Sequence, residues 1–168
     1  MELYLLRHGE AGTRVPTARD SERALTASGK EEIEKVAKSL ASQKYVFDVV
    51  ASSPLKRAKD TASIVNKALK RKGDVEEWHE LSPEGSKAAF FKRLSKLRPT
   101  AAVLCVGHEP YLTTTIGEVV GMGGERLPGS RIVLRKGGMA KLVVVRFTPK
   151  VSGELRWLLT PKQLKRLA

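Results

Sequence analysis

The chain has 168 residues, of which 41% are hydrophobic and one is cysteine, and its formal net charge is +13. This composition suits a single folded domain over residues 1–168 and excludes a disordered tail, and the lone Cys105 excludes an internal disulfide. Because no apolar run approaches the roughly 18 to 20 residues of a membrane span and no signal-peptide pattern opens the chain, we expect a soluble cytoplasmic protein without a membrane partner.

The positive charge favours phosphate-bearing or acidic partners. Ten Lys or Arg residues against one acid lie between Arg131 and Arg166, and such a surface makes nucleic acid an alternative partner. Aromatic residues make up only 5% of the chain, and there is no zinc-type Cys/His spacing. Nucleic-acid binding is therefore the less favoured interpretation.

Short apolar runs alternate with helical patterns, which is typical of an α/β protein with a largely parallel sheet. Strands are predicted at 2–6, 47–51, 75–78, 101–106 and 155–159, and helices beginning at 26 or 28, near 54, and over 83–97, 109–120 and 161–167. Residues 131–135 and 139–147 are predicted to form a hairpin around Gly137-Gly138. We expect a three-layer α/β/α sandwich with a mixed, mostly parallel sheet and an antiparallel edge.

Two local signals predict where helices begin. Ser28 followed by Glu31 has the spacing of a capping box, which places a helix start near Thr26 or Ser28. Pro54 suits the first turn of the next helix, where its missing N–H leaves no hydrogen bond unmade.

Three polar residues follow predicted strands. His8 comes just after 2–6, Arg57 lies one turn into the helix after 47–51, and His108 comes just after 101–106. Because ligands of open α/β sheets bind at the carboxyl ends of the strands, these junctions predict one shared pocket. The alternative is that both histidines are ordinary loop residues and Arg57 is a solvated helix charge. Two of the three histidines in the chain lie at such junctions, each beside a glycine, and this favours the shared site.

The residue types in this pocket suit phosphoryl transfer. The reaction needs an in-line nucleophile, for which His8 is the candidate, and positive donors around the phosphoryl oxygens. Arg7 and Arg57 provide planar forks that match a phosphate, and their charges disfavour the imidazolium form of His8. His108 is a further donor, and Gly9 permits close backbone approach to the substrate.

Other phosphatase chemistries do not match the sequence. A cysteine phosphatase needs Arg six residues after its Cys, but Tyr111 stands there, and the Asp-x-Asp pair of an aspartyl phosphatase is absent. Three histidines without clustered acids do not predict a metal site. We expect neither a metal nor another cofactor.

Four ordered motifs resemble those of the histidine phosphatase superfamily, and within it the small phosphohistidine phosphatases of the SixA type. They are Leu6-Arg7-His8-Gly9-Glu10, Arg23-x-Leu25-Thr26-x-x-Gly29, Ser53-Pro54-x-x-Arg57-Ala58 and Glu80-Leu81-x-Pro83. The resemblance implies a phosphoglycerate mutase-like fold in which His8 is transiently phosphorylated and Arg7, Arg57 and His108 complete the pocket. Larger members carry insertions that cap the site, and the chain between Arg57 and His108 is too short for one.

Two assignments stay open at this level. Glu80 or Asp20 is a possible general acid for the leaving group, and either is equally well a solvated carboxylate. Arg23 binds the phosphate or pins its loop to the following helix. Imidazole leaves readily as a neutral molecule when its other nitrogen is protonated, so a phosphohistidine substrate needs little help from such an acid.

The sequence thus predicts a metal-independent phosphatase, a hydrolase that forms phosphohistidine on His8 and releases inorganic phosphate. Its expected partner is a phosphohistidine-bearing protein or a small phosphate ester. A general small-molecule phosphomonoesterase is the first alternative. A basic, non-catalytic regulator or nucleic-acid-binding protein is the second.

Overall fold

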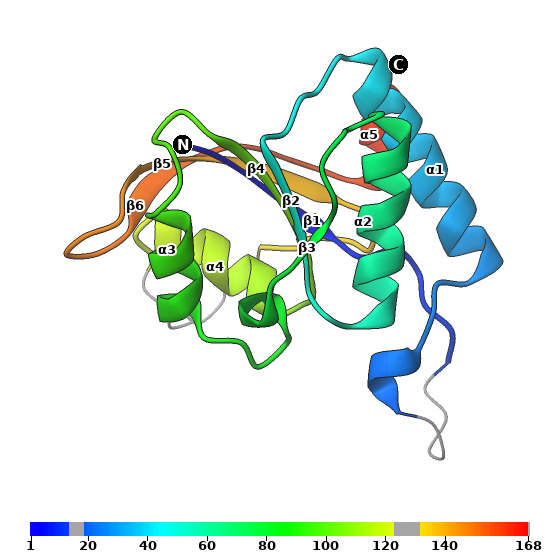
Figure 1. The fold of residues 1–168 in the computed structure, drawn as a ribbon, viewed down its shortest axis with the longest axis horizontal. Helices are drawn as coiled ribbons and strands as arrows, with labels where there is room; N and C mark the ends of the chain where they lie inside the picture. The colour runs from blue at the N-terminus through cyan, green and yellow to red at the C-terminus, as the bar shows by residue number, and fades with distance from the viewer. Residues whose placement is uncertain (14–18, 123–131, 168) are drawn as a thin grey trace.

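The computed structural model describes residues 1–13, 19–122 and 132–167, whose centre is a mixed six-stranded sheet (Figure 1). The strand order is β3-β2-β4-β1-β5-β6, with β1 to β4 parallel and β5 and β6 antiparallel. The strands are β1 (Glu2–Arg7), β2 (Val49–Ser52), β3 (Glu76–Glu77), β4 (Ala102–Gly107), β5 (Met139–Arg146) and β6 (Ser152–Leu159). The predicted mixed sheet with an antiparallel edge is confirmed.

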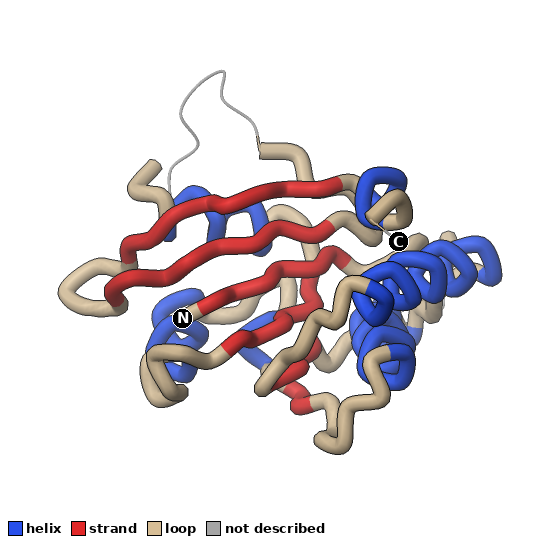
Figure 2. Tube along the Cα trace, turned by 90° about the horizontal axis from the view of Figure 1, so that it is seen from above, coloured by secondary structure: helices blue, strands red, loops and turns tan. Residues whose placement is uncertain are grey.

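Helices cover both faces of this sheet (Figure 2). α1, α2 and α5 pack on one face and α3 and α4 on the other, which confirms the three-layer α/β/α arrangement. The helices are α1 (Ala27–Ser42), α2 (Lys56–Ala68), α3 (Lys87–Leu94), α4 (Tyr111–Val119) and α5 (Pro161–Leu164), with short 3-10 turns η1 (Asp20–Glu22) and η2 (His79–Leu81). Among the described residues, none of these helices has the length and apolar composition needed to cross a membrane.

The central strands bury side chains on both faces of the sheet, because successive side chains along a strand point to opposite faces. In β1, Leu3 and Leu5 join the core under α3 and α4, whereas Tyr4 and Leu6 join the core under α1, α2 and α5. β4 is buried from Val103 to Gly107. A continuous apolar run is what a parallel strand covered on both faces requires, and this explains why β4 was predictable.

The predicted hairpin between residues 131–135 and 139–147 was wrong. β5 pairs with β1 and with β6, and residues 132–135 are not a strand; Arg131 lies outside the described residues. The glycines do form a turn, in which Gly137 has a φ of 69° and Gly138 N–H donates to the Arg135 carbonyl at 2.8 Å. However, Gly137 and Gly138 also bond to the backbone of Arg7, so this turn is held at the end of β1 and does not fold β5 back onto 132–135.

The starts of α1 and α2 differ slightly from those predicted. Thr26 caps α1, since its hydroxyl accepts from Gly29 N–H at 2.9 Å, and Ser28 is inside the helix. Pro54 precedes α2, which begins at Lys56, because the extended residue between them is the cap position.

The segment between α2 and β4 has less regular structure than predicted. β3 has only two residues, and α3 begins at Lys87 because Gly85 N–H bonds to the Ser82 carbonyl in a turn that precedes it. Residues 69–101 therefore hold β3, η2 and α3 and no inserted domain.

Candidate active site

The structure brings together the three residues from the predicted strand junctions. β1 and β4 are neighbours and pair Arg7 with Gly107, which places His8 beside His108 with ring centroids 5.0 Å apart. Arg57, in the first turn of α2, donates from Nε to His8 Nε2 at 3.3 Å. All three side chains are buried, which is unusual for such polar groups and points to a shared role.

Hydrogen bonding determines which nitrogen of His8 is available. Nδ1 lies 2.7 Å from the Gly9 carbonyl, which can only accept, so Nδ1 carries the proton. Nε2 then holds the lone pair, and its bond from Arg57 Nε fits this tautomer. Nε2 is therefore the nucleophilic atom of the ring.

Both histidines are neutral at pH 7. Burial lowers the pKa of His8 to about 4; the Gly9 carbonyl opposes this shift, and the charges of Arg57, Arg7 and Arg23 add to it. Burial likewise lowers the pKa of His108 to about 3, with His8 and Arg57 contributing. A neutral imidazole is the form that can attack phosphorus.

Ser53 orients His108, a contact that the sequence analysis missed. The buried Ser53 hydroxyl lies 2.8 Å from His108 Nε2 and accepts from Leu55 N–H at 3.2 Å. With the hydroxyl proton donated to Nε2, His108 Nδ1 carries a hydrogen, and this buried atom has no partner among the described residues. Such an atom can donate to an anion. The signal for Ser53 was its place in the Ser-Pro-x-x-Arg motif.

Asp20 links Arg57 to Arg23. Its carboxylate lies 3.0 Å from Arg57 Nη2 and 3.0 Å from Arg23 Nη2, and its carbonyl accepts from Arg57 Nη1 at 3.0 Å. Partial burial by itself raises the pKa of Asp20, but the two arginines outweigh it and the pKa is lowered. Arg23 also donates to the Gly12 carbonyl at 3.2 Å, which is a contact within its own loop and not with the following helix α1.

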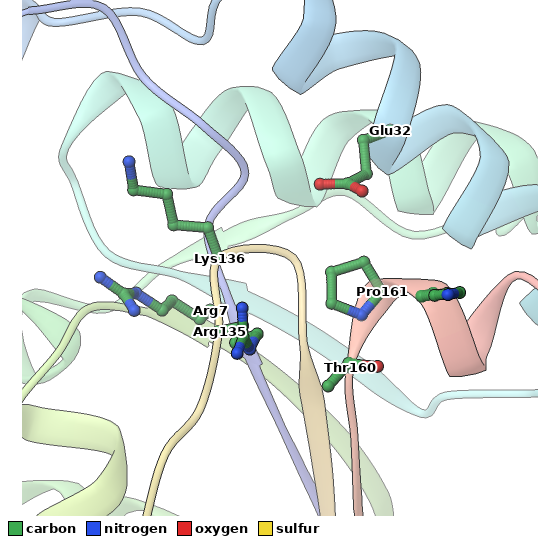
Figure 3. Close-up of a pocket in the computed structure, with 7 residues that line it drawn as sticks. Arg7, Glu32, Arg135, Lys136, Thr160 and Pro161 are labelled. Atoms are coloured by element: carbon green, nitrogen blue, oxygen red, sulfur yellow. The ribbon is translucent and has the colours of Figure 1, made fainter.

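Arg7 faces a turn of the chain and also influences His8. Its Nη1 donates to the Leu134 carbonyl at 2.9 Å, and Gly137 N–H donates to the carbonyls of both Arg7 and His8, at 3.0 and 3.2 Å. Its charge contributes to the lowered pKa of His8. Arg7 also lines a neighbouring pocket (Figure 3).

Gly9 is required by packing against α1. A Cβ at this position would lie 2.7 Å from Ile33 Cγ1. Gly9 N–H donates to the buried Thr61 hydroxyl at 3.1 Å, and this hydroxyl donates to the Arg57 carbonyl at 2.8 Å. Thr61 thus ties the His8 loop to α2. Its position four residues after Arg57, on the same helix face, could have signalled this role.

Glu80 forms its ion pair with Arg93, which is not part of the cluster of His8, His108 and Arg57. Its Oε1 accepts from Arg93 Nε at 2.9 Å. Burial raises its pKa, but its own backbone N–H and Arg93 outweigh this and the pKa is lowered. Within residues 1–13, 19–122 and 132–167, no three His, Cys, Asp or Glu side chains gather as ligands for a metal.

Comparisons with known proteins identify the family of this chain. Residues 3–83, which include His8 and Arg57, match the model of the histidine phosphatase superfamily, branch 1. An uncharacterized protein of Picosynechococcus sp. is 33% identical, over 98% of this chain and 99% of its own. The chain belongs to the histidine phosphatase superfamily.

Solved structures of this superfamily share the fold. A structure of the protein histidine phosphatase SixA complexed with tungstate has a TM-score of 0.82 and 27% identity, covering 98% of this chain and 99% of that chain. A putative alpha-ribazole-5'-P phosphatase from Escherichia coli has a TM-score of 0.75 and 21% identity, covering 96% and 97%. The second likeness concerns the fold alone. Members of the superfamily are phosphatases, and the chain is a hydrolase of this kind.

Proposed function

We propose that the protein is a phosphohistidine phosphatase in which His8 accepts the phosphoryl group. The observation that carries the proposal is the neutral, buried His8, whose Nδ1–H is tied to the Gly9 carbonyl and whose Nε2 lies 3.3 Å from Arg57 Nε. The 27% identity to the protein histidine phosphatase SixA, over nearly the whole length of both chains, supports the substrate class.

In the first step, the lone pair of His8 Nε2 attacks phosphorus while the bond to the leaving nitrogen breaks. The phosphoryl oxygens replace His8 Nε2 as the partner of Arg57, and His108 Nδ1–H donates to one of them. The leaving imidazole takes the bonding electron pair and departs neutral if its other nitrogen is protonated. Arg7 and Arg23 add positive charge near the transferred group.

In the second step, water attacks the phosphorus and the bond to His8 Nε2 breaks. Because Nδ1 keeps its proton through the hydrogen bond to Gly9, the phosphorylated ring is cationic and leaves as neutral imidazole. The attacking water loses its protons to phosphate and solvent. The products are inorganic phosphate and the original neutral His8. We propose that neither step uses a metal ion.

The two candidate proton donors favour a phosphoramidate over an ester. Both Asp20 and Glu80 have a lowered pKa and bind arginines, so both are anionic at pH 7. An alkoxide leaving group needs a proton in the transition state, whereas a protonated phosphoimidazole does not. The absence of an inserted domain within residues 69–101 also suits a substrate as bulky as a protein.

A general phosphomonoesterase is the second candidate function. The fold shared with the putative alpha-ribazole-5'-P phosphatase favours it, because the same scaffold occurs in a protein named for a small phosphate ester. Under this alternative, Asp20 or Glu80 would have to gain a proton when the substrate binds.

Phosphate release in EDTA tests the proposal. Rates are compared for a phosphohistidine peptide, a sugar phosphate and an aryl phosphate, using the wild type, His8→Gln and a His79→Gln control, since His79 is exposed. We expect preferential release from phosphohistidine that is lost only in His8→Gln. Preference for the esters, or release that EDTA abolishes, would overturn the proposal.

Asp20→Asn and Glu80→Gln separate the two candidate functions. If neither carboxyl donates a proton, the preference for phosphohistidine over the sugar phosphate stays within about threefold of that of the wild type in both variants, because loss of the Asp20–Arg57 ion pair affects both substrates alike. A loss of roughly a hundredfold that is confined to the sugar phosphate would identify the proton donor of an esterase. The measurement is kcat/KM for each substrate.

A further inference from the structure

A second, positively charged pocket lies beside Arg7. Its volume is about 600 Å³, and it is lined by Arg7, Arg135 and Lys136 together with Lys162, Thr160, Pro161 and Glu32. Figure 3 shows that the side chains of Arg7 and Lys136 extend to one side of the turn that carries Lys136. Thr160 and Pro161, at the start of α5, and Glu32 of α1 lie on the other side of this turn. The pocket is therefore built from segments far apart in the sequence.

The charges of this pocket are not balanced. Four cationic side chains line it against one carboxylate, and that carboxylate, Glu32, is bound by Lys165 at 3.1 Å. Lys136 lies 3.7 Å from the exposed Glu10. In the described part of the chain, Arg135 and Lys162 have no carboxylate partner. A hollow with uncompensated positive charge attracts an anionic group.

Backbone hydrogen bonds connect the turn of this pocket to His8. Gly137 N–H donates to the carbonyls of Arg7 and His8, and Arg7 N–H donates to the Gly138 carbonyl at 3.0 Å. The turn that carries Arg135 and Lys136 is thus bonded to the residues of the catalytic strand end.

The same turn is packed against both neighbouring helices. A Cβ on Gly137 would lie 3.2 Å from Ile33 Cδ1 of α1 and 3.3 Å from Pro161 Cγ of α5. The backbone of this turn therefore has little freedom to move, whereas the side chains of Arg135, Lys136 and Lys162 are exposed. A fixed backbone keeps the attachment points of these cations in place, which reduces the conformational entropy lost when they bind an anion.

We infer that this pocket binds a second anionic group of the substrate, next to the phosphoryl group that His8 receives. The inference rests on the proposed function and narrows its substrate class to phosphohistidine flanked by acidic residues. Arg135 presents a planar fork for a carboxylate, and Lys136 and Lys162 add point charges. A second phosphate of a small molecule has the same chemistry and is the other source of such an anion.

Binding to a non-hydrolysable phosphohistidine analogue tests the inference without relying on turnover. Two peptides are compared by calorimetry, one with Glu and one with Gln on either side of the analogue. For the wild type we expect roughly 5- to 20-fold tighter binding of the Glu peptide, a difference that shrinks at high salt. In Arg135→Gln/Lys162→Gln we expect equal binding of the two peptides.

A control variant also replaces one arginine and one lysine by glutamine, but at positions outside the pocket. Lys96→Gln/Arg146→Gln changes one exposed lysine, which precedes β4, and one exposed arginine at the far end of β5. It should keep the preference for the Glu peptide. Equal binding of both peptides by the wild type, or a preference that survives in Arg135→Gln/Lys162→Gln, would overturn the inference.

A second arm distinguishes the source of the anion and separates the two proposals. A small bisphosphate that binds more tightly than its monophosphate, with the peptides binding equally, would overturn the acidic-peptide source. Phosphate release from the Gln peptide reports on the proposed function alone. Its absence, with the binding preference intact, would remove the catalytic proposal and leave the anion pocket.

Discussion

The parallel and antiparallel halves of the sheet differ in what they bury. Strands β2, β4 and β1 have helices on both faces, and their carboxyl ends hold the buried His8, His108 and Arg57. In contrast, β6 is the edge strand, and none of its eight residues is buried. The parallel half can therefore exclude water from a reactive group. The antiparallel half contributes the turn before β5 and the start of α5, whose cations line the neighbouring pocket.

The largest expected effect is that of replacing His8, the proposed nucleophile at the end of the parallel half. His8→Gln should reduce kcat/KM for phosphohistidine by at least about a thousandfold, because glutamine cannot form the phosphohistidine intermediate that we propose on His8. His79→Gln, at an exposed position, should keep full activity. Mass spectrometry of the quenched reaction should find the phosphoryl group on His8. A phosphorylated intermediate on His108 would contradict the assignment.

Core truncation compares the stability of the two halves. Leu104 in β4 is fully buried, and Leu104→Ala should lower the free energy of unfolding by about 2 to 5 kcal/mol, because it removes packing and leaves a cavity. Leu155 in β6 is 39% exposed, and Leu155→Ala should cost less than about 1 kcal/mol. Urea unfolding measures both. Equal losses would show that the edge strand is packed as tightly as the centre.

Acid should destabilise the parallel half through its buried histidines. The pKa values of His8 and His108 in the folded state, about 4 and about 3, are below the roughly 6.5 of an unfolded histidine. As pH falls, the unfolded chain therefore takes up these protons first. The stability is fully present above about pH 6.5 and is lost progressively as pH falls through the folded pKa values.

His8→Gln isolates this contribution. Between pH 7 and pH 4.5, the wild type should lose about 1 to 3 kcal/mol more unfolding free energy than the variant, because the glutamine side chain of the variant does not titrate. Carboxylates titrate in both proteins and cancel in the comparison. Urea unfolding at the two pH values, in buffer free of phosphate, is the measurement. Parallel losses in the two proteins would contradict the buried neutral state.

The smallest expected effect concerns the turn that joins the halves. Gly137 and Gly121 both have positive φ, 69° and 79°, so alanine at either should cost about 1 to 2 kcal/mol. Only Gly137→Ala also crowds Ile33 and Pro161 and disturbs the turn bonded to Arg7 and His8. It should therefore lower kcat/KM several-fold, whereas Gly121→Ala should not. Equal activity in both variants would show that the Gly137 turn does not influence the activity of His8.

Local signals were sufficient where one residue or one run controls the structure. The apolar run at 101–106 predicted β4, because a strand buried on both faces needs no polar alternation. The arginine and histidine pattern after β1 led to the superfamily, which the family model confirms. The hairpin partner of β5 was not predictable, because strand pairing depends on which edge is free in the folded sheet.

The sequence by itself determined the α/β class, the superfamily and the strand junctions at which His8, Arg57 and His108 lie, because these follow from local apolar runs and ordered motifs. Only the tertiary structure decided how their atoms are bonded. Asp20 reaches Arg57 across 37 positions and Ser53 reaches His108 across 55, and such contacts depend on packing between distant segments. The same packing buries His8, which lowers its pKa to about 4, and builds the cationic pocket from α1, α5 and the Gly137 turn.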